Sequence, residues 1–302
     1  MIFEENKTLD RIFTSLFDRY KENVPDVSKI TNALIEKKVI NDQRDIVNDH
    51  VAFRTMGVAN LGIASFEKIF LKHGYTPMDT YFFEKKRLNS CWYAPPSDAY
   101  PRIFISELRV DDLPKEQQTI IRKYTDGVTS DPVDQLDLDN AESVGHFFHK
   151  PLWNLPSKKD YQQLLEVSEY AAWVIYNRYY LNHYTISVHE LDAPYNSLEK
   201  FNEFLEKIGV KLNDAGGIIK MSGDELLLQS STVANVLEAE FADGEKLSIA
   251  GSYVEFAERR VLPEFAHLAP DQIKRKNRRE GFETGNADKI FESTYSSQVG
   301  KN

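Results

Sequence analysis

An internal repeat constrains the fold of this chain more than any other feature of its sequence. A β-favouring run containing His50 is followed by a helical stretch that ends at Gly74, two short β-like runs and a last strand. The same order begins again at His183, with a helix that ends at Gly209. The two intervals from histidine to glycine are 24 and 26 residues. Because self-similarity in a fixed order marks repeated architecture, the sequence predicts a strand–helix–strand–strand–strand unit used twice.

The repeat divides the chain into parts that we expect to form one domain. The expected parts are N-terminal helices at 1–45, a first unit at 46–110, a helical insert at 111–181, a second unit at 182–260 and a tail at 261–302. Within the units, strands are predicted at 49–55, 80–84, 90–94, 102–108, 182–188, 218–221, 225–229 and 252–258, and helices at 65–73 and 197–208. The insert is predicted to hold a helix at 111–123 and one long helix at 161–180. The expected fold class is α+β, with paired βαβββ modules forming a curved mixed sheet and additional helices around it.

Composition excludes several classes of protein. With 41% hydrophobic and 12% aromatic residues, the chain has ample material for a core and is not disordered. Its single cysteine excludes an internal disulfide framework. No apolar run approaches the roughly 18–20 residues of a membrane-spanning helix, and the acidic residues 1–6 do not look like an export signal. We therefore expect a cytoplasmic protein with no membrane partner.

The charge of the chain argues against nucleic acid as a partner. Its formal net charge is −10, whereas proteins that bind nucleic acids usually carry a positive field. The exception is a basic cluster at residues 274–279, which we interpret as a solvated helical face in preference to a phosphate-binding patch. The chain also contains no Walker A, G-x-G-x-x-G, G-x-S-x-G or H-E-x-x-H motif. Nucleotide binding, serine-hydrolase chemistry and zincin chemistry are therefore unsupported.

Three residues of the repeat suggest a metal site inside the curve of the sheet. His50 and His183 open the first strand of each unit at equivalent positions, and a repeat can bring equivalent positions together. Glu255 lies within the apolar last strand of the second unit, where a buried carboxylate is costly unless it is paired or bound to a metal. Two histidines and one carboxylate with open positions are typical of non-haem Fe(II) oxygenases. On its own, a histidine in a strand is more often structural.

Arg54 and Tyr253 are the other candidates for this site. Arg54 shares a strand face with His50 and lies roughly 13 Å along the strand from it, a gap that long side chains can close around a ligand. Its planar guanidinium would suit a substrate carboxylate, although a surface ion pair explains the residue equally well. Tyr253 shares the face of Glu255 and could line the site.

The remaining histidines are weaker candidates. His146 and His149 have a plausible helical spacing for two ligands but lie in the insert. His189 is about 20 Å along the strand from His183, which is too far for a shared metal. His73 and His267 are expected at the surface.

The motifs together resemble the DUF1338 family, which includes 2-oxoadipate dioxygenase/decarboxylases. The resemblance covers about residues 5–295 and is carried by the runs at 49–55, 182–185, 253–259 and 281–294. It implies a fold similar to the vicinal oxygen chelate superfamily. One departure is length, since the chain is shorter than the longer members and is expected to lack their extra C-terminal segment that contacts the substrate.

The resemblance also implies a reaction and its residues. Fe(II) would be held by His50, His183 and Glu255, with Zn or Ni possible in purified protein, and Arg54 would bind the substrate carboxylate and serve catalysis. The partners would be O₂ and a 2-oxo dicarboxylic acid such as 2-oxoadipate, giving 2-hydroxyglutarate and CO₂ in lysine catabolism. Two alternatives stay open: a metal-dependent hydrolase or glyoxalase-like enzyme of the same fold, and a ligand binder without catalysis. The sequence does not define the oligomeric state.

Overall fold

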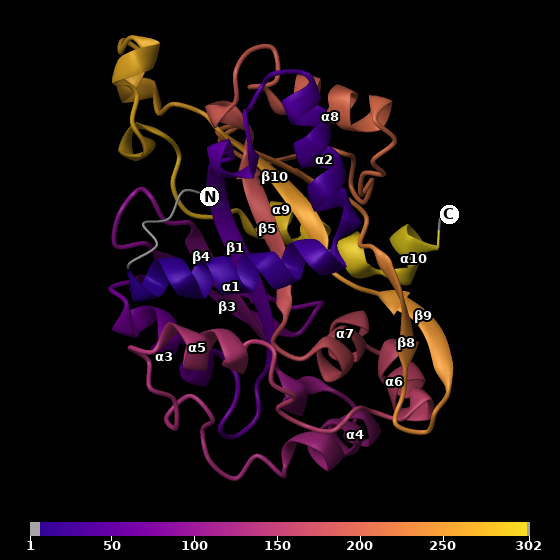
Figure 1. Cartoon of the computed structure of the whole chain (residues 1–302). Helices are drawn as coiled ribbons and strands as arrows, with labels where there is room; N and C mark the ends of the chain where they lie inside the picture. Colours follow the sequence, from indigo (N-terminus) through magenta and orange to yellow (C-terminus); the bar gives the residue numbers. More distant parts are fainter. Residues whose placement is uncertain (1–6, 301–302) are drawn as a thin grey trace.

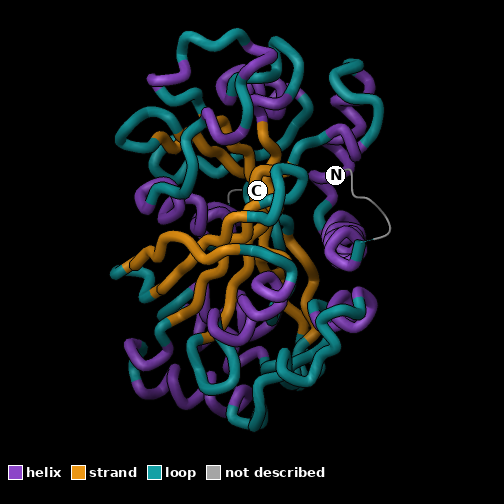
Figure 2. Tube along the Cα trace, turned by 90° about the vertical axis from the view of Figure 1, so that its left-hand side faces the viewer, coloured by secondary structure: helices purple, strands orange, loops and turns teal. Residues whose placement is uncertain are grey.

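The repeat folds into one curved sheet of eight strands. The computed structural model describes residues 7–300, so the acidic residues 1–6 lie outside the described residues. The strand order is β2-β3-β4-β1-β5-β10-β7-β6, in which the two halves mirror each other about the β1–β5 pair. Figure 2 shows these strands through the middle of the molecule with helices on both sides. The expected α+β class with paired βαβββ modules is confirmed.

Each module contains the elements that its sequence predicted. The first comprises β1 (Asn48–Met56), α3 (Ile63–Lys72), β2 (Thr76–Phe83), β3 (Leu88–Ala94) and β4 (Arg102–Leu108). The second comprises β5 (Leu181–Ser187), α8 (Leu198–Lys207), β6 (Lys220–Met221), β7 (Leu227–Ser231) and β10 (Tyr253–Arg259). In both modules the first strand pairs in parallel with the last, β1 with β4 and β5 with β10.

The modules join where β1 and β5 pair antiparallel, and this pairing is irregular at two places. β1 has one extra residue between Asn48 and Val51, and β5 has one extra residue between Leu181 and His183. A bulge re-aims the side chains next to it. Each irregularity adjoins one of the two repeat histidines. Both strands are therefore bent at the residue whose side chain is a candidate ligand.

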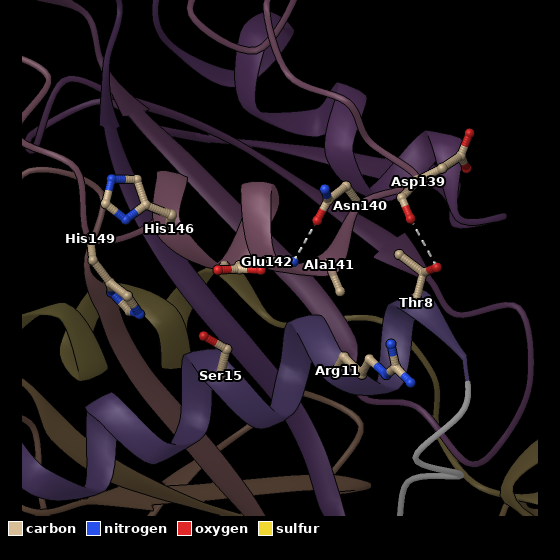
Figure 3. A pocket seen from close by; sticks show the side chains of 10 residues that line it. Thr8, Arg11, Ser15, Asp139, Asn140, Ala141, Glu142, His146 and His149 are labelled. Carbon is tan, nitrogen blue, oxygen red and sulfur yellow. Dashed lines mark hydrogen bonds between the residues drawn. The ribbon is translucent and has the colours of Figure 1, made fainter.

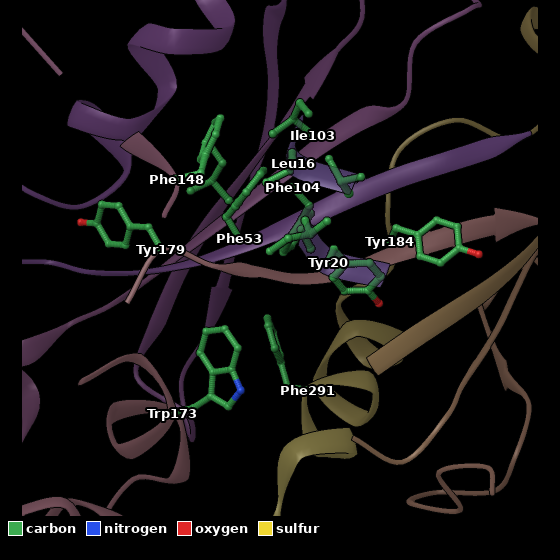
Figure 4. Close-up of a cluster of buried hydrophobic side chains, with 14 of the residues drawn as sticks. Leu16, Tyr20, Phe53, Ile103, Phe104, Phe148, Trp173, Tyr179, Tyr184 and Phe291 are labelled. Atoms are coloured by element: carbon green, nitrogen blue, oxygen red, sulfur yellow. The ribbon is translucent and has the colours of Figure 1, made fainter. Parts of the chain in front are cut away.

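Helices cover the face of the sheet that points away from His50. These are α3, α8 and the N-terminal helices α1 (Thr8–Asn23) and α2 (Pro25–Glu36), with α1 running across the sheet in Figure 1. Apolar side chains at alternate strand positions pack under them: the Phe53 ring lies 4.7 Å from that of Phe66 on α3, and Tyr184 lies 5.1 Å from Phe17 on α1. Figure 4 shows the residues of this core around Phe53 and Tyr184. Burial of this face leaves the other face for the site.

The helical insert differs from its prediction in two respects, since a helix at 141–147 was not predicted and the helix predicted at 161–180 is divided. It contains α4 (Lys115–Thr125), α5 (Ala141–Phe147), α6 (Lys158–Leu165) and α7 (Glu169–Asn177). The single long helix predicted at 161–180 is wrong, because the chain breaks between α6 and α7. Ser168 begins a new helix there, since its hydroxyl accepts a hydrogen bond from the backbone N–H of Ala171.

A hairpin that was not predicted from the sequence lies between the third and fourth strands of the second module. β8 (Val236–Glu240) and β9 (Lys246–Ala250) pair only with each other and project beside α6 in Figure 1. The strands are short and half-exposed, so their alternation is a weak signal. Phe241 anchors the hairpin, because its ring lies 5.3 Å from those of Tyr161 and Tyr176 on the insert helices.

The tail folds back over the face of the sheet that carries His50. It includes α9 (Thr284–Ile290), α10 (Ser296–Val299) and several short 3-10 turns. The solvated helical face predicted at 274–279 is only partly observed: Lys274 and Lys276 are exposed, whereas the arginines are half-buried and bonded to the rest of the protein. Arg275 donates to the Tyr100 carbonyl and Arg278 to the Arg259 carbonyl.

Within residues 7–300, the helices are all too short or too polar to span a bilayer.

The aromatic core makes a testable prediction about stability. Phe66 is fully buried against Phe53 and Tyr179, so Phe66→Ala should lower the free energy of unfolding by about 3–5 kcal/mol. Phe82→Ala is the matched control, because Phe82 is 67% exposed and its loss should change stability by less than about 0.5 kcal/mol. Urea unfolding followed by circular dichroism measures both. Equal effects would contradict the assignment of Phe66 to the core.

Candidate metal centre

The three candidate ligands meet at the centre of the sheet. Donor atoms of His50, His183 and Glu255 lie within 4.8 Å of one another, and all three side chains are buried. His183 Nε2 is 3.0 Å from Glu255 Oε2, and the two histidine Nε2 atoms are 3.4 Å apart. A divalent ion about 2.1 Å from two donors at right angles separates them by about 3 Å, so the spacing fits one ion. Their role as ligands stays a prediction.

Each histidine is oriented by the residue before it. His50 Nδ1 lies 2.9 Å from Asp49 Oδ1, and His183 Nδ1 lies 3.0 Å from Asn182 Oδ1. Neighbours in a regular strand point to opposite faces, so these contacts depend on the two irregularities in the β1–β5 pairing. With Nδ1 engaged, each ring presents Nε2 to the centre, which is the arrangement usual for metal-binding histidines.

Asp49 is fixed in turn by two arginines. Arg259 donates two hydrogen bonds to the Asp49 carboxylate, from Nε to Oδ2 at 2.7 Å and from Nη2 to Oδ1 at 2.9 Å. Arg102 Nη1 donates a third to Oδ2 at 3.2 Å. These arginines hold the pKa of the buried Asp49 carboxyl well below its usual range, although burial alone would raise it. Arg102 also pairs with Glu280 of the tail. Asp49 is therefore ionised and lies beside the His50 ring.

Glu255 is held by a chain of amides that begins in the tail. Gln229 Nε2 donates to Glu255 Oε1 at 2.6 Å, and Asn286 Nδ2 donates to Gln229 Oε1 at 3.0 Å. Because Asn286 occupies the oxygen of the Gln229 amide, the amide nitrogen faces Glu255. The other carboxylate oxygen, Oε2, is left facing His183.

Electrostatics keep the carboxylate ionised. Burial raises the pKa of Glu255, but the nearby His50 and His183 outweigh it and hold that pKa far below the usual range. Burial lowers the pKa of His183. For His50, burial is outweighed by Glu255 and Asp49, so its pKa is raised. A negative oxygen beside two imidazole nitrogens is a donor set suited to a divalent transition metal.

Arg54 is a buried cation without a carboxylate partner. It is 1% exposed, so the surface ion pair considered from the sequence is wrong. Nη1 donates to Thr294 Oγ1 at 2.9 Å and Nη2 to the Phe291 carbonyl at 3.1 Å, while Nε has no hydrogen-bond partner. Within residues 7–300, its guanidinium forms no ion pair with a carboxylate. Burying a charge in this way is costly unless an anion completes the site.

Aromatic rings surround the Arg54 guanidinium. Its central carbon lies 5.2 Å from the ring centres of Tyr170 and Trp173 and 5.5 Å from that of Phe291. Figure 4 shows the side chains of Trp173 and Phe291 facing each other. Tyr253 belongs to the same region, since its ring stacks on His183 at 4.7 Å. The side chains expected to line the site therefore share one buried face, with Arg54 at one end.

His146 and His149 lie elsewhere. They border an open groove of about 750 Å³ between α1 and α5, shown in Figure 3 beside Ser15 and Glu142. Among the described residues, the group at His50 is the one set of three or more histidine, cysteine or acidic side chains whose donor atoms converge. The lower weight given to the insert histidines agrees with this geometry.

Sequence reasoning missed the residues that support the ligands. Asp49 and Asn182 were visible as polar residues just before each repeat histidine, and that shared pattern could have identified them. Gln229 and Asn286 carried no such signal, because their roles depend on contacts between segments far apart in the chain. Thr294 and Phe291 lie in the tail, to which no role was assigned from the residues themselves.

Comparison with known proteins identifies the family. A family model described as 2-oxoadipate dioxygenase/decarboxylase matches residues 12–268. The chain belongs to this family. It is 44% identical over 271 residues to the 2-oxoadipate dioxygenase/decarboxylase of Arabidopsis thaliana, covering 86% of this chain and 71% of that protein. The corresponding protein of Oryza sativa subsp. japonica is 42% identical over 303 residues, covering 97% of this chain and 81% of the relative.

Solved structures support the same family and fold. Hydroxyglutarate synthase from Oryza sativa, in complex with 2-oxoadipate, matches with a TM-score of 0.88 and 40% identity, covering 99% of this chain and 96% of the other. A glyoxalase-superfamily protein from Ralstonia eutropha JMP134 matches with a TM-score of 0.71 and 21% identity, covering 94% and 90% of the two chains. The second likeness shows the fold alone. The expected resemblance to the DUF1338 family and to the glyoxalase-like fold is confirmed.

The expectation of a cytoplasmic protein is wrong on this comparison. The Arabidopsis relative is chloroplastic and the Oryza relative is chloroplastic or amyloplastic. The composition of a folded domain carries little information about compartment, because targeting depends on segments that receptors read.

The hydrogen bonds from Asn286 through Gln229 to Glu255 lead to a prediction about metal affinity. Gln229→Leu keeps the volume of the side chain but removes the hydrogen bond that positions Glu255, so metal affinity should fall by about 10–100-fold. Competition with a chromogenic chelator measures the affinity. Gln118→Leu is the matched control, since it removes a buried glutamine of α4 that bonds to backbone carbonyls. A wild-type affinity in Gln229→Leu would show that Glu255 does not need the amide.

Proposed function

We propose that this chain is an Fe(II)-dependent dioxygenase/decarboxylase that converts 2-oxoadipate and O₂ to 2-hydroxyglutarate and CO₂. The observation that carries the proposal is the pairing, on one buried face, of a convergent His–His–Glu set with an arginine that forms no ion pair with a carboxylate of residues 7–300. Membership of the family and the likeness to a hydroxyglutarate synthase with 2-oxoadipate bound support it. One molecule of each substrate gives one molecule of each product, so atoms balance. A place in lysine catabolism stays a prediction.

His50, His183 and Glu255 would hold the metal. Bound there, Fe(II) would supply a centre that a 2-oxo acid can chelate and that can donate electrons to O₂. Three protein ligands leave up to three of six octahedral positions, enough for both substrates. Asp49, Asn182 and Gln229 keep the donor atoms aimed at the centre.

Arg54 would bind the carboxylate at the far end of the substrate. A planar guanidinium can form two parallel hydrogen bonds with a carboxylate, and Arg54 Nε would not have to break an existing hydrogen bond to do so. The guanidinium is close enough to the centre to contribute to the lowered pKa of His183, after the larger effect of burial. A dicarboxylate held between the centre and Arg54 would be excluded from bulk water, because Arg54, His50 and Glu255 are each at most 2% exposed. That exclusion strengthens every charge–charge contact in the site.

An oxygen-uptake experiment tests the reaction. Protein reconstituted anaerobically with Fe(II) should consume O₂ and release CO₂ in equal amounts when 2-oxoadipate is added, and Zn²⁺ should bind competitively and inhibit because it is redox-silent. An oxygen electrode and mass spectrometry of the product measure this. If Fe(II)-loaded protein consumes no O₂ with any 2-oxo acid while Zn²⁺-loaded protein hydrolyses an ester or thioester under argon, the metallohydrolase alternative holds.

A variant tests the carboxylate-binding role of Arg54. Arg54→Lys keeps the charge but loses the planar fork, so kcat/KM for 2-oxoadipate should fall on the order of 100-fold while the bound metal is retained. The matched substrate is 2-oxohexanoate, which has the same chain without the far carboxylate. Wild-type protein should strongly prefer 2-oxoadipate, and the variant should lose most of that preference. An unchanged preference would remove Arg54 from the substrate site.

A further inference from the structure

A second cavity borders Asp49, the residue that orients His50. Its volume is about 340 Å³, within the usual range for a small-molecule site. Five cationic side chains line it: Arg102, Arg259, Lys274, Arg275 and Arg278. Three of them come from the basic cluster at 274–279, whose alternative interpretation from the sequence was a phosphate-binding patch. The electrostatic potential in the cavity is therefore expected to be positive, although the chain as a whole has a net charge of −10.

The cluster's cations in this cavity retain capacity for an anion. Lys274 forms no ion pair with any carboxylate in residues 7–300. Among the described residues, the carboxylates nearest to Arg275 and Arg278 are distant, at 3.6 Å for Glu280 and 3.9 Å for Glu190. Arg275 Nη2 is buried without a hydrogen-bond partner there. Such distances are long for a guanidinium–carboxylate bond.

The carboxylates of the cavity do not neutralise it. Three carboxylates line the cavity against five cationic side chains: Asp49 is already engaged by Arg259 and Arg102, and Asp98 and Glu190 are exposed to solvent, as is Lys274. Glu280, outside the cavity lining, pairs with Arg102. The cations also crowd one another. Arg259 and Arg275 both lie close enough to Arg102 to repel its charge. An anion in the cavity would relieve this repulsion.

We propose that this cavity binds a small dianion, either a dicarboxylate or inorganic phosphate, through Lys274, Arg275 and Arg278. Both ligands present anionic oxygens that guanidinium and ammonium groups recognise. The site is separate from the one proposed for the substrate, since the cavity borders Asp49 and does not include Arg54 or Glu255. Occupancy would reach the metal centre through Arg102 and Arg259, which touch both the cavity and the carboxylate that orients His50.

Calorimetric titration of the holoprotein tests the proposal with two probes, inorganic phosphate and glutarate. Glutarate is a dicarboxylate without a 2-oxo group, so it lacks the chelating end of the proposed substrate. At least one probe should bind saturably, and the comparison distinguishes the two sources of anion. Lys274→Glu should weaken that binding on the order of tenfold, because it replaces an attraction with a repulsion. Lys276→Glu is the matched control: it makes the same charge change in the same cluster, but Lys276 does not line the cavity. Its effect should stay under about twofold.

The outcomes separate this site from the proposed function. Binding that survives in Arg54→Lys but weakens in Lys274→Glu supports the second site, whether or not the protein turns over 2-oxoadipate. A Co(II)-substituted protein should also change its visible absorption on binding the probe, because the support of His50 is perturbed. No saturable binding of either probe overturns the proposal. Equal losses in Lys274→Glu and Lys276→Glu, or a loss confined to Arg54→Lys, also overturn it.

Discussion

The ion pair between Asp49 and Arg259 is the contact on which the rest of the site depends. Both side chains are 1% exposed, and two hydrogen bonds join them. Asp49 fixes His50 on β1, while Arg259 ends β10, the strand that carries Glu255. Arg259 also donates to the backbone carbonyls of Arg279 and Gly281. One ion pair thus connects both modules and the tail. Breaking a buried pair typically costs about 3–5 kcal/mol, because it leaves a charge without a partner.

The tail completes a site that the sheet alone leaves open. The two modules place His50, His183 and Glu255 on one face, but that face would be exposed to water without a cover. Phe282 packs its ring 4.8 Å from that of His50, and Phe291 lies over Arg54. Asn286 acts at the same time on the carboxylate through Gln229. The tail therefore has two effects. It excludes water from the site, and it orients the Glu255 carboxylate.

The elements predicted best from the sequence are those with a clear period: the two repeated modules and the N-terminal helices. Strand and helix periods identified both modules, because each contains a local pattern that occurs twice. The histidines followed from their equivalent positions and Glu255 from its apolar strand. The β8–β9 hairpin and the break at Ser168 were missed, since both depend on short segments with weak periodicity. The Asn286–Gln229–Glu255 hydrogen bonds and the tail contacts of Arg54 could not be predicted, because contacts between residues far apart in the chain produce no periodic pattern in the sequence.

The position of the covering segment also has a consequence for protein synthesis. A nascent chain emerges from its N-terminus, so His50 and His183 leave the ribosome well before the residues that cover and orient them. Asn286 and Thr294 are among the last described residues to emerge. The two histidines are thus available early, while the covering residues Phe282 and Phe291 and the Arg54 partner Thr294 emerge later. A chain that stopped before Phe282 would therefore expose to solvent the face of the sheet that carries His50, His183 and Glu255.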